Sequence, residues 1–310
     1  MTLPGSSLSE LRTAPVPARV HLAAGSVAAL FSLNYVISKL GMHAFSPLVF
    51  AWLRVLGSAA VLNALLPRSR EPWSRGDWGR VTGYAILGVV INQALFLSGL
   101  ALTSAHVAAI LMTAIPLFTL GAAIVMGQER ATGAKLAGIT LAFGGALVIV
   151  AREGLQGAVK SLSGDLLLLG NALAYSFYLV LSKRDMKRLG PHRVIARMFA
   201  IGTVLMIPLC IVPLARESWP SIPARAWLAL LLVIAGPTVA AYLLNAWALA
   251  HADSSLVAAY TYLQPVLTAA LAATLLGERI GWAAGVAAVI IFTGVWLAGR
   301  KGETVVVVSG

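Results

Sequence analysis

Long apolar runs that carry almost no charge alternate along the chain with short polar segments. Each run is close to the ~20 residues that a helix needs to cross the hydrocarbon core of a bilayer. Because lipid offers no partners to backbone N–H and C=O groups, such runs must be helical. The pattern predicts an all-α polytopic membrane protein with ten transmembrane helices. They are expected at about 20–40, 45–66, 78–100, 103–126, 132–151, 163–182, 194–214, 226–249, 253–276 and 281–299.

Composition supports this class. The chain is 59% hydrophobic and only 11% charged, with a mean hydropathy of +0.87, whereas soluble domains carry about 25% charged residues. The net charge of +12 comes from short basic clusters between apolar runs. That distribution is typical of topology-setting loops rather than of a nucleic-acid-binding face. The lipid bilayer is therefore an expected partner, and nucleic acid is not.

The positive charges also orient the chain. With the N-terminus inside, 15 of the 23 Lys and Arg residues fall on the inner side and six on the outer side. Cytoplasmic loops are enriched in these residues. We therefore expect a multi-pass protein of the cell (inner) membrane with both termini in the cytoplasm.

A segment of the first half of the chain recurs about 149 residues later. Pro116 precedes Glu129 by 13 residues, and Pro265 precedes Glu278 by the same 13. Five spans per half is an odd number, so the second half must cross the membrane in the opposite sense. The sequence thus predicts two inverted five-helix repeats, a recurrent device of secondary transporters whose binding site lies between the halves.

The expected organisation follows from the spans and the repeat. It comprises a cytoplasmic tail (1–19), a first repeat (20–151), a linker (152–162), a second repeat (163–300) and a C-terminal tail (301–310).

Several motifs resemble the drug/metabolite transporter superfamily, and specifically proteins with two EamA domains. They are N-Y-V-I-S-K at 34–39, Arg54 inside the second span, N-Q-A-L-F-L-S-G-L-A-L-T-S-A at 92–105, G-Q-E-R at 127–130 and G-E-R at 277–279. The resemblance implies ten helices, cytoplasmic termini and a central cavity lined mainly by helices 1, 3, 4, 6, 8 and 9. It also implies transport, often export, of small metabolites such as amino acids.

Polar and aromatic residues form stripes on these cavity helices. Asn171, Tyr175 and Tyr178 are spaced by four and three residues, which places them on one helix face. Each single residue also fits interhelical hydrogen bonding, worth ~0.5–2 kcal/mol, or interfacial anchoring of a Tyr. As a set they favour a substrate-binding cavity wall. The candidates are Asn34, Asn92, Gln93, Asn171, Tyr175, Tyr178, Tyr242, Asn245, Tyr260 and Gln264.

Four basic residues occupy equivalent places in the two halves. Arg54 and Arg197 fall within spans, where an Arg costs roughly 2.5–3.5 kcal/mol at the centre. Each is interpreted either as a gate or anion contact, or as a structural anchor bonded to helix-end carbonyls. Lys39 and Lys183 end helices 1 and 6 and either gate the cavity mouths or serve as ordinary interfacial lysines.

The residues that the repeat conserves best are expected to serve architecture and motion. Pro116 and Pro265 each remove a backbone hydrogen bond and loosen the preceding turn, which permits either flexing or a fixed kink. Glu129 and Glu278 each stand beside an Arg at a helix junction. We expect them to pair with that Arg or to cap the next helix.

The chain lacks H-E-x-x-H, G-x-S-x-G and phosphate-loop motifs, and its histidines lack metal-ligand spacing. No catalytic residue, metal or cofactor is predicted, and the protein is not expected to be an enzyme. The sequence favours a secondary transporter that exports a small-molecule substrate by alternating access, as a monomer or homodimer. The alternatives are an importer, an antiporter or, less favoured, an intramembrane enzyme.

Overall fold

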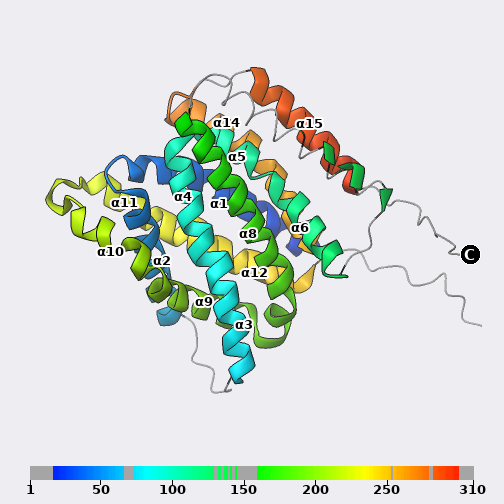
Figure 1. Cartoon of the computed structure of the whole chain (residues 1–310), viewed down its shortest axis with the longest axis horizontal. Helices are drawn as coiled ribbons and strands as arrows, with labels where there is room; N and C mark the ends of the chain where they lie inside the picture. The colour runs from blue at the N-terminus through cyan, green and yellow to red at the C-terminus, as the bar shows by residue number, and fades with distance from the viewer. Residues whose placement is uncertain are drawn as a thin grey trace, which may run out of the picture.

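The computed structural model describes residues 17–65, 73–128, 132–133, 136–138, 140–141, 144, 159–252, 254–278 and 282–299. The described residues form helices and their connections, with no strand among them. The fold is that of a helical membrane protein, as the hydrophobic pattern predicts (Figure 1).

The helices of the first half whose bounds are described end at or before residue 125. They are α1 (Ala18–Met42), α2 (Pro47–Leu65), α3 (Arg75–Ala85), the π-helical segment η1 (Ile86–Ile91), α4 (Asn92–Leu102), α5 (Ala105–Leu111) and α6 (Ala114–Val125).

The helices of the second half follow residue 158. They are α8 (Val159–Leu189), α9 (Pro191–Leu205), α10 (Ile207–Arg216), the short 3₁₀ turn η2 (Trp219–Ser221), α11 (Ala224–Val233), the π-helical η3 (Ile234–Ala240), α12 (Ala241–His251), α13 (Ser254–Ala259), the 3₁₀ turn η4 (Tyr260–Leu263), α14 (Gln264–Leu275) and α15 (Trp282–Gly299).

Six continuous helical stretches among the described residues are long and apolar enough to cross a membrane. A seventh is obtained if α9 and α10, bent by 58° at their junction, count as one span. Large apolar side chains remain on the outside, for example Leu22 at 71% and Val125 at 84% exposure. An apolar exterior of this kind suits lipid rather than water. The span expected at 132–151 falls mostly outside the described residues.

The two halves share the same irregularities. The helix α3–η1–α4 is interrupted midway by a π-helical segment, and so is α11–η3–α12. A turn separates α5 from α6 just before Pro116, and η4 separates α13 from α14 just before Pro265. Proline lacks the N–H that would continue the preceding turn, which explains both breaks. Segments of this type often mark functional hinges.

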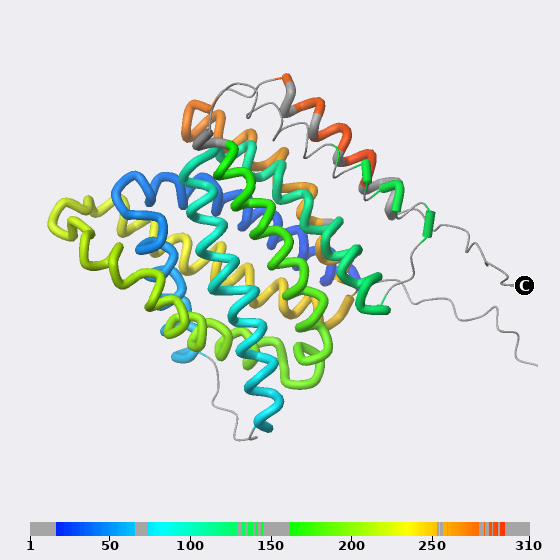
Figure 2. The backbone as a smooth tube through the Cα atoms, viewed as in Figure 1, coloured from blue at the N-terminus to red at the C-terminus, as the bar shows by residue number. Residues whose placement is uncertain are grey.

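The halves interleave rather than standing apart. Helix α4 runs along α8, α2 packs on α9, and α1 contacts α11, α12 and α14. Figure 2 shows the orange α14 beside the turquoise α5, although the two are far apart in sequence. The crossing of α4 and α8 depends on glycine, because a Cβ atom on Gly99 would lie 2.8 Å from the carbonyl oxygen of Gly164. Small residues of this kind let membrane helices approach closely.

Candidate functional site

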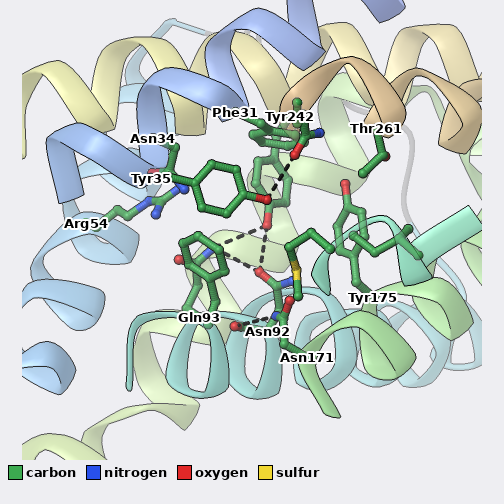
Figure 3. A pocket seen from close by; sticks show the side chains of 14 residues that line it. Phe31, Asn34, Tyr35, Arg54, Asn92, Gln93, Asn171, Tyr175, Tyr242 and Thr261 are labelled. Atoms are coloured by element: carbon green, nitrogen blue, oxygen red, sulfur yellow. Dashed lines mark hydrogen bonds between the residues drawn. The ribbon is translucent and has the colours of Figure 1, made fainter. Parts of the chain in front are cut away.

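A pocket lies at the centre of the bundle, between the two halves (Figure 3). Together with its mouth it encloses about 470 Å³. Helices α1, α2, α4, α6, α8, α12 and α14 contribute to its wall. The turn between α5 and α6 contributes Met112, and η4 contributes Thr261. The lining residues are Phe31, Asn34, Tyr35, Arg54, Asn92, Gln93, Phe96, Met112, Ile115, Asn171, Tyr175, Tyr242, Thr261 and Gln264.

One wall of the pocket is a hydrogen-bonded cluster around Tyr242. The Gln93 Nε2 group donates to the Tyr242 hydroxyl at 3.2 Å and to Asn92 Oδ1 at 3.1 Å. The Tyr242 hydroxyl lies 3.1 Å from Asn92 Oδ1, and Asn171 Nδ2 donates to the Asn92 carbonyl at 2.8 Å. Gln93 Oε1 is buried and has no protein partner. The cluster therefore offers an acceptor to a bound molecule.

The opposite wall joins α1 to α14. The Tyr35 hydroxyl donates to Gln264 Oε1 at 3.0 Å, and Ser38 donates to Asn34 Oδ1 at 3.0 Å. Tyr35 also packs edge-on against Phe96, with ring centroids 5.4 Å apart. Polar groups thus face one another across an aromatic interior, an arrangement typical of a small-molecule site.

Among the described residues that line the pocket, Arg54 alone is charged. Its side chain is buried, with 2% exposure. The Nε group donates to Thr238 Oγ1 at 2.6 Å, while Nη1 is buried without a partner. In Figure 3 the guanidinium group lies on the pocket side of α2, near Asn34 and Tyr35. Arg54 therefore presents positive charge to the pocket.

A second, smaller pocket shares Phe31, Tyr175, Thr261 and Gln264 with the central one. It lies toward the N-terminal half of α1, and Asn245 and Tyr260 line it. Asn245 Nδ2 donates to the Tyr175 hydroxyl at 3.1 Å.

The Tyr260 hydroxyl lies 2.5 Å from His21 Nδ1, at an exposed position. The smaller pocket therefore adjoins the central one on the side where Tyr260 contacts His21.

Of the predicted cavity residues, Tyr178 lies away from both pockets, and so does the gating candidate Arg197. Tyr178 is fully buried against Gly88 and Tyr175 and is absent from both linings. Arg197 is exposed on α9, with its guanidinium carbon 6.0 Å from the ring centroid of Trp78. Equivalent positions of the two halves thus have different surroundings.

Glu278 holds one end of the bundle together. Its carboxylate accepts from the backbone N–H groups of Ala105 at 2.9 Å and His106 at 3.2 Å, and it lies 2.7 Å from His106 Nδ1. Lys39 Nζ is 3.5 Å away. Burial raises the pKa of Glu278. The hydrogen bonds from His106 and the backbone, together with the Lys39 charge, lower that pKa by more, so that it falls to about 2.

The sequence led us to expect Glu278 to pair with the adjacent Arg or to cap the following helix. Among the described residues it caps α5 in the other half, because the first-turn N–H groups of α5 lack intrahelical acceptors and face it. Arg279 and Glu129 lie outside the described residues.

The other end carries an ion-pair cluster that the sequence analysis did not identify. Arg80 Nε lies 2.7 Å from Asp185, and Arg188 pairs with both Asp77 and Asp185. The Tyr84 hydroxyl donates to Asp185 at 2.8 Å. The spacing of Ser74 and Asp77, which form a capping box at the start of α3, was the available signal. Lys183 lies nearby on α8, two residues before Asp185.

The pocket can bind a small solute with an anionic or polar group and an apolar body. Its lining residues include no acid, His or Cys, so the described part of the site lacks the usual nucleophile–base pair of a hydrolase. The sequence analysis missed the roles of Tyr35, Met112 and Thr261. Tyr35 sits within the N-Y-V-I-S-K motif beside Asn34 and could have been found there.

Comparison with known proteins agrees with this picture. The EamA-like transporter family matches this chain over two segments, residues 19–151 and 162–300. An uncharacterized transporter of Archaeoglobus fulgidus is 28% identical over 291 residues, which cover 91% of this chain and 98% of the relative. A probable amino-acid metabolite efflux pump of Escherichia coli K12 is 26% identical, covering 87% of this chain and 91% of the relative.

A solved crystal structure shares the fold. It has a TM-score of 0.66 at 22% identity and covers 91% of this chain and 97% of the solved chain.

Proposed function

This chain belongs to the EamA-like transporter family, with two EamA segments, and from that premise we propose that it exports a small metabolite, such as an amino acid, by alternating access. The family and its relatives are transporters rather than enzymes. Export of an amino-acid metabolite is suggested by the name of the E. coli relative. The chain is accordingly a multi-pass membrane protein that acts on a small-molecule substrate.

The central pocket is the observation that carries the proposal. Its polar wall is built from both halves, since Gln93 and Asn92 come from α4 and Tyr242 comes from α12. Gln93 and Tyr242 occupy equivalent positions, 149 residues apart, and they bond to each other. A site between two related halves is the arrangement that lets transporters expose one site to each side in turn.

The topology proposed for this function has ten spans in two inverted repeats, residues 20–151 and 163–300. A linker at 152–162 joins the repeats, and the tails 1–19 and 301–310 lie in the cytoplasm. This assignment rests on the bias of positive charge and on the odd number of spans per half. In a bacterial cell the protein would lie in the inner membrane.

Two features supply the means of alternation. Charged clusters hold the opposite ends of the bundle, Glu278 with Lys39 at one and Arg188 with Asp77 and Asp185 at the other. With cytoplasmic termini, the Glu278 cluster faces outward. The helix interruptions before Pro116 and Pro265 line or adjoin the pocket. We infer that the helices bend there as one cluster opens and the other closes.

The test is a thermal-shift screen of the purified protein against amino acids, amines, organic acids and nucleotides, followed by flux measurements in proteoliposomes. A stabilising solute should leave preloaded vesicles faster when the protein is present. Stabilisation without flux in either direction would contradict the transport proposal, and uptake without efflux would contradict export.

A further inference from the structure

We propose that the solute is an organic carboxylate and that Arg54 binds its carboxylate group. This inference rests on the proposed function, because it assigns a substrate class to the same pocket. Solutes that carry a carboxylate and an apolar body should bind in the pocket, and amines that lack a carboxylate should not.

Arg54 is held in place but has unused hydrogen-bonding capacity. The Thr238 hydroxyl donates its single proton to the Val233 carbonyl at 2.7 Å, so its lone pairs are free to accept from Arg54 Nε at 2.6 Å. That contact fixes one edge of the guanidinium group. Nη1 remains buried without a partner. A guanidinium fork is suited to bidentate binding of a carboxylate.

The charge of Arg54 lacks an acidic counterpart in the part of the pocket that the structure describes. No acid is among the described side chains that line it, so none of these neutralises Arg54. At the ends of the bundle, Asp77 and Asp185 pair with arginines, and Glu278 pairs with Lys39. An unneutralised charge inside a membrane protein is costly and usually marks a functional site. A bound anion would supply the missing partner.

The rest of the pocket lining also suits an anion with an apolar body. Phe31, Phe96 and Ile115 provide apolar surface beside Arg54, while Gln93 Oε1 provides an unpaired acceptor. An ammonium group finds only neutral acceptors here. The wall therefore favours a solute whose charged group is anionic and whose body is apolar.

A purely structural Arg would bond to helix-end carbonyls. Among the contacts of the described residues, the hydrogen bond of Arg54 goes instead to a side chain in the middle of a span, Thr238 of η3. The equivalent Arg197 faces outward and lies over Trp78. Arg197→Gln is thus a matched control, because it removes the same charge from the corresponding helix without touching the pocket.

The experiment measures thermal stabilisation of the purified full-length protein by matched acid–amine pairs. The pairs are 4-methylpentanoate with 3-methylbutylamine, and 3-phenylpropanoate with 2-phenylethylamine. Each pair shares its apolar body and differs in the sign of its charge. The proteins are the wild type, Arg54→Gln, Arg54→Lys and Arg197→Gln.

We expect at least one acid to stabilise the wild type and Arg197→Gln, with at least tenfold weaker affinity for its amine partner. Arg54→Gln should lose that response while melting, without ligand, no lower than the wild type. Arg54→Lys should retain a weakened response, because it keeps the charge but loses the fork.

Three results would overturn the assignment: stabilisation by the amines rather than the acids, no stabilisation by any acid, or an unchanged acid response in Arg54→Gln. Because the wild type alone decides between acid and amine, the test holds even if Arg54→Gln does not fold. If acids bind but no solute moves across proteoliposomes, the proposed function fails and the carboxylate site stands. If another solute is transported and no acid binds, the carboxylate site fails and the proposed function stands.

Discussion

Arg54 and Arg197 lie 143 residues apart at the same point of two related helices, yet their surroundings are opposite. Arg54 is 2% exposed and lines the central pocket, whereas Arg197 is exposed and lies beside Trp78. Asn34 and Tyr178, which are also equivalent, differ in a similar way. Asn34 lines the pocket, and Tyr178 is buried away from it. The duplication repeats the scaffold, while the chemistry of the pocket lies where the halves have diverged.

The largest expected difference is in transport by the two arginine variants. Arg54→Gln should lower the flux of the stabilising solute by ten- to a hundredfold, since a hydrogen bond to a charged group is worth about 1.5–3 kcal/mol. Arg197→Gln should stay within about twofold of the wild type, since surface substitutions usually change little. Initial rates of efflux from proteoliposomes measure both. Equal losses in the two variants would remove the distinction between the halves.

A smaller effect is expected where the equivalent residues meet. Tyr242→Phe removes the hydroxyl that contacts Asn92 and Gln93. It should weaken solute binding about fivefold, as a membrane hydrogen bond is worth about 1 kcal/mol. In a double-mutant cycle with Gln93→Leu, the two changes should not be additive. Titration of all four proteins with the solute measures the coupling. Strict additivity would show that the two halves do not cooperate at the pocket.

The contribution of Glu278 to the stability of the fold should depend on pH. Its folded pKa of about 2 lies below the ordinary 4.5, so its ionised form stabilises the fold fully above about pH 4.5 and progressively less as pH falls toward 2. Glu278→Gln should therefore melt lower than the wild type at pH 5, where the carboxylate is ionised. The gap should narrow below pH 4.5. Melting curves of both proteins across this range provide the test, and a gap that widens in acid would contradict the assignment.

The smallest effects are expected at Asn34 and Tyr178. Asn34→Ala removes an amide from the pocket wall and should weaken solute binding about threefold. Tyr178→Phe removes a buried hydroxyl that lies outside both pockets and should leave binding within error. The sequence alone ranks the two residues equally, so a stronger effect at Tyr178 would favour the sequence pattern over the structure. Binding titrations of the two variants decide the matter.

The sequence was informative where local pattern controls structure. Apolar runs predicted the membrane helices, and the Pro116 and Pro265 repeat marked the two helix interruptions. The orientation of Arg54 could not be predicted, because it depends on Thr238 in a π-helical segment of the other half. The partner of Glu278 could not be predicted either, because the start of α5 reaches Glu278 only through tertiary packing. The repeat boundaries and the number of spans remain predictions.

The most direct test of the account is an experimental structure of the protein with its stabilising solute bound. We predict density for the solute in the central pocket, with an anionic group within hydrogen-bonding distance of Arg54 and the remainder between Phe31, Phe96 and the Gln93–Tyr242 pair. Solute density outside that pocket, with the pocket still unfilled, would contradict the central claim that the two halves share one binding site.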